Sequence, residues 1–308
     1  MLRNLNICDG KLAECDPSEA QVSVYVAPDE GERRYLLDQL KVDEHTLNSA
    51  LDPDELARLE FEPEHTALIL KRPKSYCSED DLLFKVASIG LFLFKDRLII
   101  VTAEDGPLFD GKPNIRMRSL QDAILKLLYR CIYHFEQHLK SINTISATIE
   151  QEINTAMENK HLLNLFTLEK SLVYYLNAIN SNSVLIGKLR TNAARVGFTP
   201  EHLEYVDDIV IENNQCREQA QIYSNILASL MDARAGIVAN NLNVLMKNLN
   251  IIMIALMLPT LVVSIFSMNV ALPVAHEHRW AFWFVMALAT ASAVAVAVIW
   301  WRKRLFPR

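Results

Sequence analysis

Two long apolar segments near the C-terminal end constrain the fold of this 308-residue chain more than any other feature. Residues 249–268 contain no charged side chain and are long enough for one helix to cross about 30 Å of hydrocarbon. Residues 280–301 are also uncharged, and a pair of tryptophans marks each end of that segment, as in an interfacial aromatic belt. We therefore predict a membrane protein whose two transmembrane helices form a hairpin, with an outer loop at 269–279.

The distribution of basic residues predicts the orientation of this hairpin. Arg302, Lys303 and Arg304 directly follow the second span, whereas the loop between the spans contains only Arg279 and Glu277 as charged residues. Because basic residues are retained on the cytoplasmic side, we expect both termini to lie in the cytosol. The chain would then be integral to the inner or plasma membrane.

The N-terminal part, residues 1–118, has the pattern of a small α/β domain in the cytosol. Short runs rich in Val, Ile, Leu and Phe are separated by Pro-containing turns, which is typical of β-strands. These runs cover residues 22–27, 66–71, 89–94 and 97–102. No phosphate-binding glycine loop, zinc-protease motif or nucleophile elbow occurs, so we predict neither an enzyme nor a resident cofactor.

Residues 119–248 have a helical pattern, and we interpret them as a cytosolic stalk below the hairpin at 249–308. Thr199 and Pro200 form an N-cap followed by proline at the first helical position. From there we expect one helix to continue into the first span, over a length of roughly 100 Å at 1.5 Å per residue. A helix of that length needs partners, so the pattern predicts a coiled coil of several chains.

The charge balance narrows the range of ligands. The formal net charge is −6, and the last seven residues contribute four positive charges, so residues 1–301 sum to −10. An acidic body of this kind attracts cations and repels nucleic acid. We therefore expect divalent cations as ligands and exclude nucleic acid as a partner.

Polar side chains recur along the first span at alternating steps of three and four residues. Each position holds an amide, a hydroxyl or a thioether, whereas the residues between them are mostly Leu, Ile or Val. The positions are Asn243, Met246, Asn250, Met253, Met257, Thr260, Ser264 and Ser267, and we call them the polar seam. A heptad step keeps such a seam facing the partner helices, where it can line a water-filled pore or join helices by hydrogen bonds. Leu249 and Met246 form a candidate apolar constriction, and Pro259 is expected to bend the span.

The segment 258–273 resembles the signature of the CorA family of divalent-cation channels and transporters. In that family the first span ends in an aromatic residue followed by Gly-Met-Asn, and a short loop with a proline follows. Here Phe266 is the aromatic residue, Met268 and Asn269 match the Met-Asn pair, and Pro273 lies in the loop. Ser267 replaces the glycine of the family pattern.

This resemblance implies a homopentameric funnel with five first spans around a central pore. Ser267, Met268 and Asn269 would form the ion entry, where a ring of amide oxygens suits Mg²⁺ that keeps its water shell. The resemblance also implies that cations bound between cytosolic domains favour the closed state. Asp208 would supply one carboxylate, and Asp80 or Asp81 would face it.

Two alternatives remain open from the sequence. His276, Glu277 and His278 in the outer loop form a candidate metal site, and imidazole favours Zn²⁺, Co²⁺ or Ni²⁺ over Mg²⁺. Replacement of the family glycine by Ser267 instead favours a membrane scaffold or sensor that keeps the fold without conducting ions.

A second histidine pair lies in the cytosolic part. His134 and His138 are four residues apart on one helix face, which permits a two-ligand metal site but is more typical of a structural surface.

Overall fold

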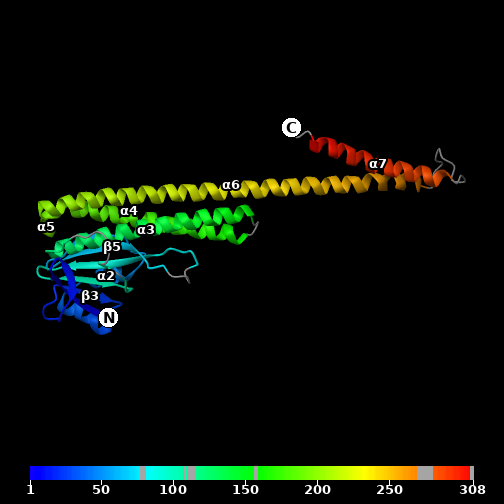
Figure 1. Cartoon of the computed structure of the whole chain (residues 1–308). Helices are drawn as coiled ribbons and strands as arrows, with labels where there is room; N and C mark the ends of the chain where they lie inside the picture. The colour runs from blue at the N-terminus through cyan, green and yellow to red at the C-terminus, as the bar shows by residue number, and fades with distance from the viewer. Residues whose placement is uncertain (77–80, 107, 110–115, 156–158, 269–279, 306–308) are drawn as a thin grey trace. The chain divides into compact units, whose positions relative to one another are not determined.

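The computed structural model describes residues 1–76, 81–106, 108–109, 116–155, 159–268 and 280–305. The chain divides into two compact units, Met1–Met231 and Asp232–Arg308, which are described separately below. Figure 1 shows the order of the elements along the chain. The boundaries expected at 118/119 and 248/249 stay predictions.

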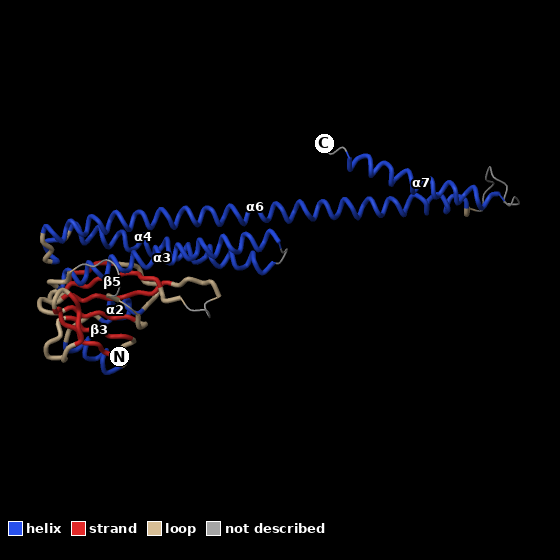
Figure 2. Tube along the Cα trace, in the orientation of Figure 1, coloured by secondary structure: helices blue, strands red, loops and turns tan. Residues whose placement is uncertain are grey.

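The first unit contains a seven-stranded sheet (Figure 2). The strands are β1 (Leu2–Cys8), β2 (Lys11–Glu14), β3 (Val22–Val26), β4 (Arg58–Phe61), β5 (Thr66–Pro73), β6 (Val86–Leu93) and β7 (Leu98–Thr102). Their order is β2-β1-β3-β7-β6-β5-β4, with β3 parallel to β7 and every other neighbouring pair antiparallel. All four predicted strand runs are therefore confirmed, whereas β1, β2 and β4 were not expected.

Both faces of the central sheet are buried, because successive strand residues point to opposite sides. Leu68 and Leu70 belong to the core on one face, whereas Ala67 and Ile69 belong to the core on the other. The second face is covered by a π-helical turn at Tyr35–Gln39, which follows the short exposed helix α1 (Glu30–Arg34), and by α2 (Glu44–Leu51). A Cβ on Gly90 would lie 2.5 Å from Cβ of Ala50, so glycine allows α2 to pack this closely.

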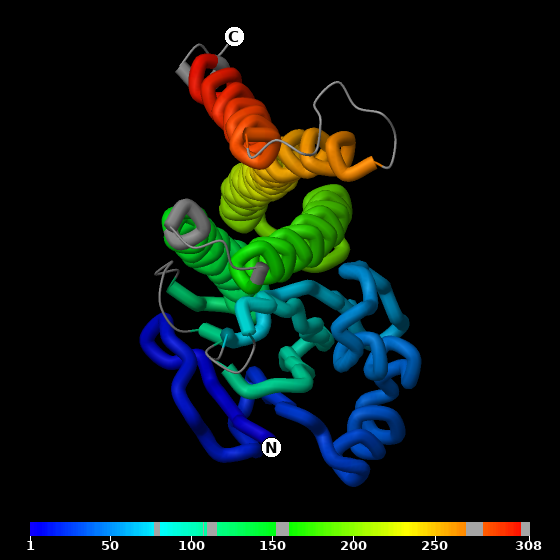
Figure 3. The backbone as a smooth tube through the Cα atoms, turned by 90° about the vertical axis from the view of Figure 1, so that its right-hand side faces the viewer, coloured from blue at the N-terminus to red at the C-terminus, as the bar shows by residue number. Residues whose placement is uncertain are grey.

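Two long helices cover the other face of the sheet, α3 (Leu120–Thr155) and α4 (Asn159–Thr191) (Figure 3). A side chain of α4 pairs directly with a strand backbone: Asn182 accepts a hydrogen bond from the amide of Lys71 and donates one to its carbonyl, both at 2.8 Å. Strand β4 pairs with β5 only up to Ile69, so the Asn182 amide replaces the missing strand neighbour at Lys71. This contact fixes α4 on the sheet.

The short helix α5 (Ala193–Val196) leads to α6 (Pro200–Phe266), which begins where the sequence predicted. Oγ1 of Thr199 accepts a hydrogen bond from the amide of His202 at 3.3 Å, which confirms the N-cap. The buried Nε2 of His202 donates to Asp122 at 3.1 Å, and Asp122 also accepts from the amides of Arg118 and Ser119. The starts of α3 and α6 are therefore joined by one hydrogen-bond network.

The second unit contains the remainder of α6 and the last helix, α7 (Trp280–Leu305). Both helices have a stretch long and apolar enough to cross a membrane, and almost none of either stretch is buried within the chain. As predicted, α6 continues without a break into the first apolar segment, through Pro259, and ends at Phe266.

Candidate functional site

One face of α6 in the second unit is partly covered, and it identifies the side that α7 packs against. The half-buried residues of this stretch are Ile251, Ala255, Pro259, Val262 and Phe266. On α7 the covered residues are Ala281, Val285, Ala289, Ser292, Ala293 and Val296. The covered face of α7 consists mainly of small residues, which allow close helix packing in membranes. The rings of Phe266 and Phe284 meet edge to face, with 6.3 Å between centroids.

From Met253 to Ser267 the polar seam lies on the opposite side of α6. At 3.6 residues per turn, the positions from Met253 to Ser267 lie roughly half a turn around the helix from the face that contacts α7. Every seam residue is exposed in the single chain. A polar stripe that faces away from its own partner helix needs water or other copies of α6 as its neighbours.

The first three seam residues instead border a groove between the two helices. Asn243, Met246 and Asn250 line this groove, of about 880 Å³, together with Ile299 and Trp300 of α7. Leu249, the candidate constriction residue, is 47% exposed. The constriction proposed for Met246 and Leu249 therefore requires other copies of the chain.

Two seam hydroxyls donate to the backbone of their own helix. Oγ1 of Thr260 donates to the carbonyl of Leu256 at 2.7 Å, and Oγ of Ser267 donates to the carbonyl of Ser264 at 2.8 Å. Because each hydroxyl hydrogen is used within the helix, the oxygen lone pairs stay available as acceptors. Oxygens of this kind suit a hydrated cation.

Ser267 ends α6 without backbone strain. Its amide donates to the carbonyls of Val263 and Ser264 at 3.1 and 3.2 Å. Among the described residues other than glycine, positive φ angles occur only at Asp9, Ala27, Lys41, Asp81 and Leu82. Ser267 therefore adopts a conformation open to any residue, and the glycine of the family pattern is not needed there for its φ angle.

Several predicted site residues lie outside the described part of the chain. These are Asp80, Asn269, His276, Glu277 and His278. Met268 is described and is 53% exposed at the end of the first span.

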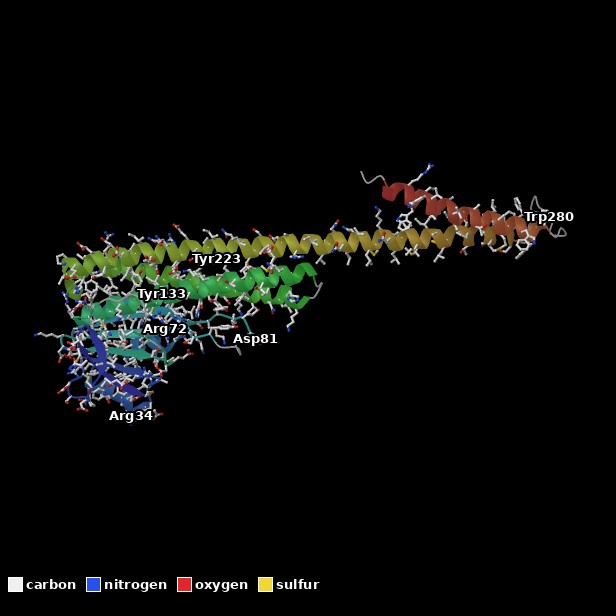
Figure 4. All side chains as sticks on the ribbon, in the orientation of Figure 1. Arg34, Arg72, Asp81, Tyr133, Tyr223 and Trp280 are labelled. Carbon is white, nitrogen blue, oxygen red and sulfur yellow. The ribbon has the colours of Figure 1, made fainter. Side chains whose placement is uncertain are left out.

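The predicted regulatory carboxylates Asp208 and Asp81 are both exposed within the first unit. Asp81 lies on the loop between β5 and β6 (Figure 4), and Asp208 lies near Glu136 and Glu212 around Tyr129. Burial, followed by the charges of these carboxylates, raises the pKa of Tyr129. Across the described residues, no three His, Cys, Asp or Glu side chains lie close enough together to hold a metal ion. A regulatory site built on Asp208 would therefore need carboxylates from another copy.

Tryptophan side chains lie exposed at both ends of α7. Trp280 and Trp283 are 81% and 70% exposed at one end, and Trp301 is 65% exposed at the other. Figure 4 shows Trp280 at the start of the helix. This arrangement is typical of a membrane span with aromatic residues at both interfaces.

Comparison with known families decides the identification. The family model of the CorA-like Mg²⁺ transporter proteins matches residues 24–304. This chain belongs to that family. As a CorA-like protein it is a membrane transporter of divalent cations and not an enzyme, which confirms the resemblance seen in the sequence.

Solved structures support the CorA-like fold over the whole chain. The complete CorA magnesium transporter of Methanocaldococcus jannaschii matches with a TM-score of 0.80 and 19% identity, over 98% of this chain and 97% of that one. The full-length CmaX protein matches with a TM-score of 0.72 and 14% identity, over the same shares of the two chains. The cytoplasmic domain of ZntB from Vibrio parahaemolyticus matches with a TM-score of 0.59 and 13% identity, over 77% of this chain and 98% of that domain. No curated protein sequence matches the chain.

The CorA-like fold confirms the predicted class: an N-terminal sheet domain, a long helix and two C-terminal apolar helices. The sequence reasoning did not find the face of α6 that contacts α7. Its half-buried positions recur at steps of four, four, three and four residues, but their side chains are as apolar as the lipid-facing ones. The small side chains of α7 do not indicate the contact in advance either, because Ala287, Ala291 and Ala295 are exposed.

Proposed function

We propose that five copies of this CorA-like chain surround a pore through which Mg²⁺ crosses the membrane passively. The observation that carries the proposal is the position of the seam residues from Met253 to Ser267, on the side of α6 opposite to α7. In such a ring α7 faces lipid, and the seams of neighbouring copies face one another around water. The family description, with its Mg²⁺ substrate, supports the choice of ion.

Ion selection in this proposal rests on neutral oxygen atoms. Mg²⁺ dehydrates reluctantly and is held well through its water shell by amide and hydroxyl oxygens. Asn269, carried over from the family pattern, would form the outer ring, and Ser267 and Thr260 would offer hydroxyl oxygens below it. Met246 and Leu249 would close the pore at its cytosolic end by excluding water.

We further propose that both termini lie in the cytosol and that internal Mg²⁺ closes the pore. The basic residues after the second span support the orientation. An ion bound between exposed acids of neighbouring copies, Asp208 among them, would offset their repulsion and stabilise one arrangement of the ring. The exposure of Asp208 and Asp81 on the first unit is consistent with such a contact.

Transport of Zn²⁺ or a related transition metal is the second candidate. It is favoured by His276 and His278 in the outer loop, because imidazole binds these ions better than it binds Mg²⁺. The two candidates predict different ions and different sensitive residues.

Uptake into proteoliposomes tests both candidates, with Mg²⁺ and Zn²⁺ supplied separately. We expect Mg²⁺ uptake by the full-length protein and a loss of at least about tenfold in Asn269→Ala, the effect of about 1.4 kcal/mol on the barrier. Asn241→Ala, which changes an exposed amide of α6 off the seam, serves as the matched control and should transport normally.

Other outcomes assign the function differently. Uptake of Zn²⁺ without Mg²⁺, lost in His276→Ala/His278→Ala, would establish the transition-metal candidate. If neither ion enters through an assembled and correctly oriented oligomer, the conduction proposal is wrong and the scaffold interpretation replaces it.

A further inference from the structure

Two imidazoles lie together on α3, within the first unit and outside the ion pathway. His134 and His138 are one helical turn apart, with their ring centroids 4.4 Å apart and their planes at 71°. A metal ion bonded to one nitrogen of each ring, at about 2.0–2.1 Å, needs two rings close together and turned relative to each other. The two rings meet edge to face at this short separation.

The buried side of the pair is held by α4. Nδ1 of His138 shares a hydrogen bond of 2.6 Å with the hydroxyl of Tyr175, which is fully buried. The edge of the Phe84 ring also contacts the ring of His138, at 5.3 Å between centroids. When Nδ1 carries the proton and donates to Tyr175, the lone pair of Nε2 is free for a metal ion. A second partner that fixes the ring in this way is typical of metal-binding histidines.

The pair is accessible from solvent. Both rings are half-buried, and His138 lines an open groove of about 520 Å³ together with Tyr76, Phe84 and Gln137. A small hydrated ion can therefore reach the ring of His138.

The electrostatic surroundings select the kind of ion. Burial lowers the pKa of both histidines to about 4, so the rings are neutral at neutral pH, as metal binding requires. Arg72 and Arg130 also lower the pKa of His134, and their charges oppose any bound cation. The charge of Lys140, which also lines the groove, is paired with Glu136 at 2.6 Å. Only an ion that bonds strongly to imidazole offsets this repulsion, which favours transition metals over Mg²⁺.

We propose that His134 and His138 bind one transition-metal ion per chain, of the Zn²⁺, Co²⁺ or Ni²⁺ class, with water completing its coordination. Because the described residues provide no cluster of three ligands, the ion exchanges readily. The site is separate from the polar seam, so it gives the cytosolic domain a response to transition metals that is independent of the transported ion.

Metal titration of the purified full-length protein tests this site. Zn²⁺ is added in the presence of excess Mg²⁺, which occupies sites that prefer oxygen ligands, and bound Zn²⁺ is counted by competition with a chromogenic chelator. We expect His134→Ala/His138→Ala to lose one Zn²⁺ per chain. His45→Ala, which removes an exposed histidine of α2, should lose none.

Tyr175→Phe gives a finer test, because it keeps both imidazoles and removes only the hydroxyl that positions His138. We expect about tenfold weaker Zn²⁺ binding with unchanged stoichiometry, the usual effect of losing such a partner. Equal affinity in this variant would overturn the positioning role of Tyr175.

Co²⁺ spectroscopy of the unsubstituted protein keeps the test valid if a variant folds poorly. Imidazole-bound Co²⁺ should give visible absorption bands that Zn²⁺ abolishes by displacement. Absence of these bands, or equal Zn²⁺ binding by the double variant and the unsubstituted protein, would overturn the proposal. Neither result depends on whether the pore conducts Mg²⁺.

Discussion

His65 shows how burial sets the properties of a single residue. Its side chain is 5% exposed and lies between the rings of Phe92 and Phe94, with centroids 5.7 and 4.9 Å away. Neither ring nitrogen has a hydrogen-bond partner within the described chain. Burial therefore lowers the pKa of His65 below its ordinary value of 6.5, although Glu62 and Glu64 oppose the shift.

This shift predicts acid sensitivity of the first unit. The unfolded chain binds a proton at His65 below pH 6.5, and the folded chain binds it only at lower pH. The unfolded state therefore holds more protons in that window, so stability falls as the pH drops from 6.5 through the folded pKa. Thermal unfolding of the full-length protein is measured at neutral and mildly acidic pH. The drop in unfolding temperature on acidification should be smaller for His65→Leu than for the unsubstituted protein.

The matched control for this prediction is His45→Leu. His45 is exposed on α2, and its replacement should leave the drop in unfolding temperature on acidification unchanged. If the unfolding temperature of His65→Leu drops on acidification as much as that of the unsubstituted protein, His65 is not a source of the acid sensitivity.

Single residues differ in how far the sequence predicts them. The N-cap at Thr199 follows from local spacing and is confirmed, whereas the pore-lining role of the seam stays a prediction. The role of Asn182 could not be predicted, because its partner Lys71 lies 111 positions away and only the packed fold brings them together. The contact of His138 with Tyr175 could not be predicted either, because these residues lie 37 positions apart on different helices.

At the scale of elements, strands covered on both faces were the predictable ones. Strands β6 and β7 and the first part of β5, up to Leu70, are mostly apolar, which is typical of a sheet with helices on both sides. Strands β1, β2 and β4 were missed because they lie toward the edges, are mostly short and contain charged residues such as Lys11 and Arg58. The parallel pairing of β3 with β7 could not be predicted from the sequence either, because these strands are far apart along the chain.

Helix α6 carries Asp208 near its start and the polar seam near its end, without a break between them. In the proposed gate, an ion bound at Asp208 would contact the same helix that lines the proposed pore. Its neighbour Asp207 is already paired with Arg190 of the same chain, at 2.8 Å.

Substitution of these two carboxylates tests the proposed gate. In proteoliposomes loaded with Mg²⁺, the unsubstituted protein should be closed, whereas Asp208→Asn should keep at least about tenfold faster uptake of labelled Mg²⁺. Asp207→Asn should behave like the unsubstituted protein, because that charge is neutralised within its own chain. Equal closure of all three proteins by internal Mg²⁺ would show that Asp208 has no part in gating.

At the scale of the whole molecule, one chain does not complete the proposed site. The side of α6 that faces α7 is half-buried, but the seam from Met253 to Ser267 is exposed on the other side, and the regulatory carboxylates gather no cluster within the described residues. The sequence predicted that partners were needed, from the length of α6 and the heptad steps. It could not predict how many, because the periodicity of one helix is the same in several ring sizes.

The central claim is that the seam of α6 faces an ion pathway, and adjacent cysteines test it most directly. Ser264 lies on the seam, and the exposed Ile265 lies about 100° around the helix. Mg²⁺ uptake is measured before and after treatment with a small cationic thiol reagent, with the unsubstituted protein as the control for its five native cysteines. We predict that treatment stops uptake through Ser264→Cys and leaves Ile265→Cys and the unsubstituted protein active. Continued uptake through modified Ser264→Cys, or equal block of Ile265→Cys, would contradict the account.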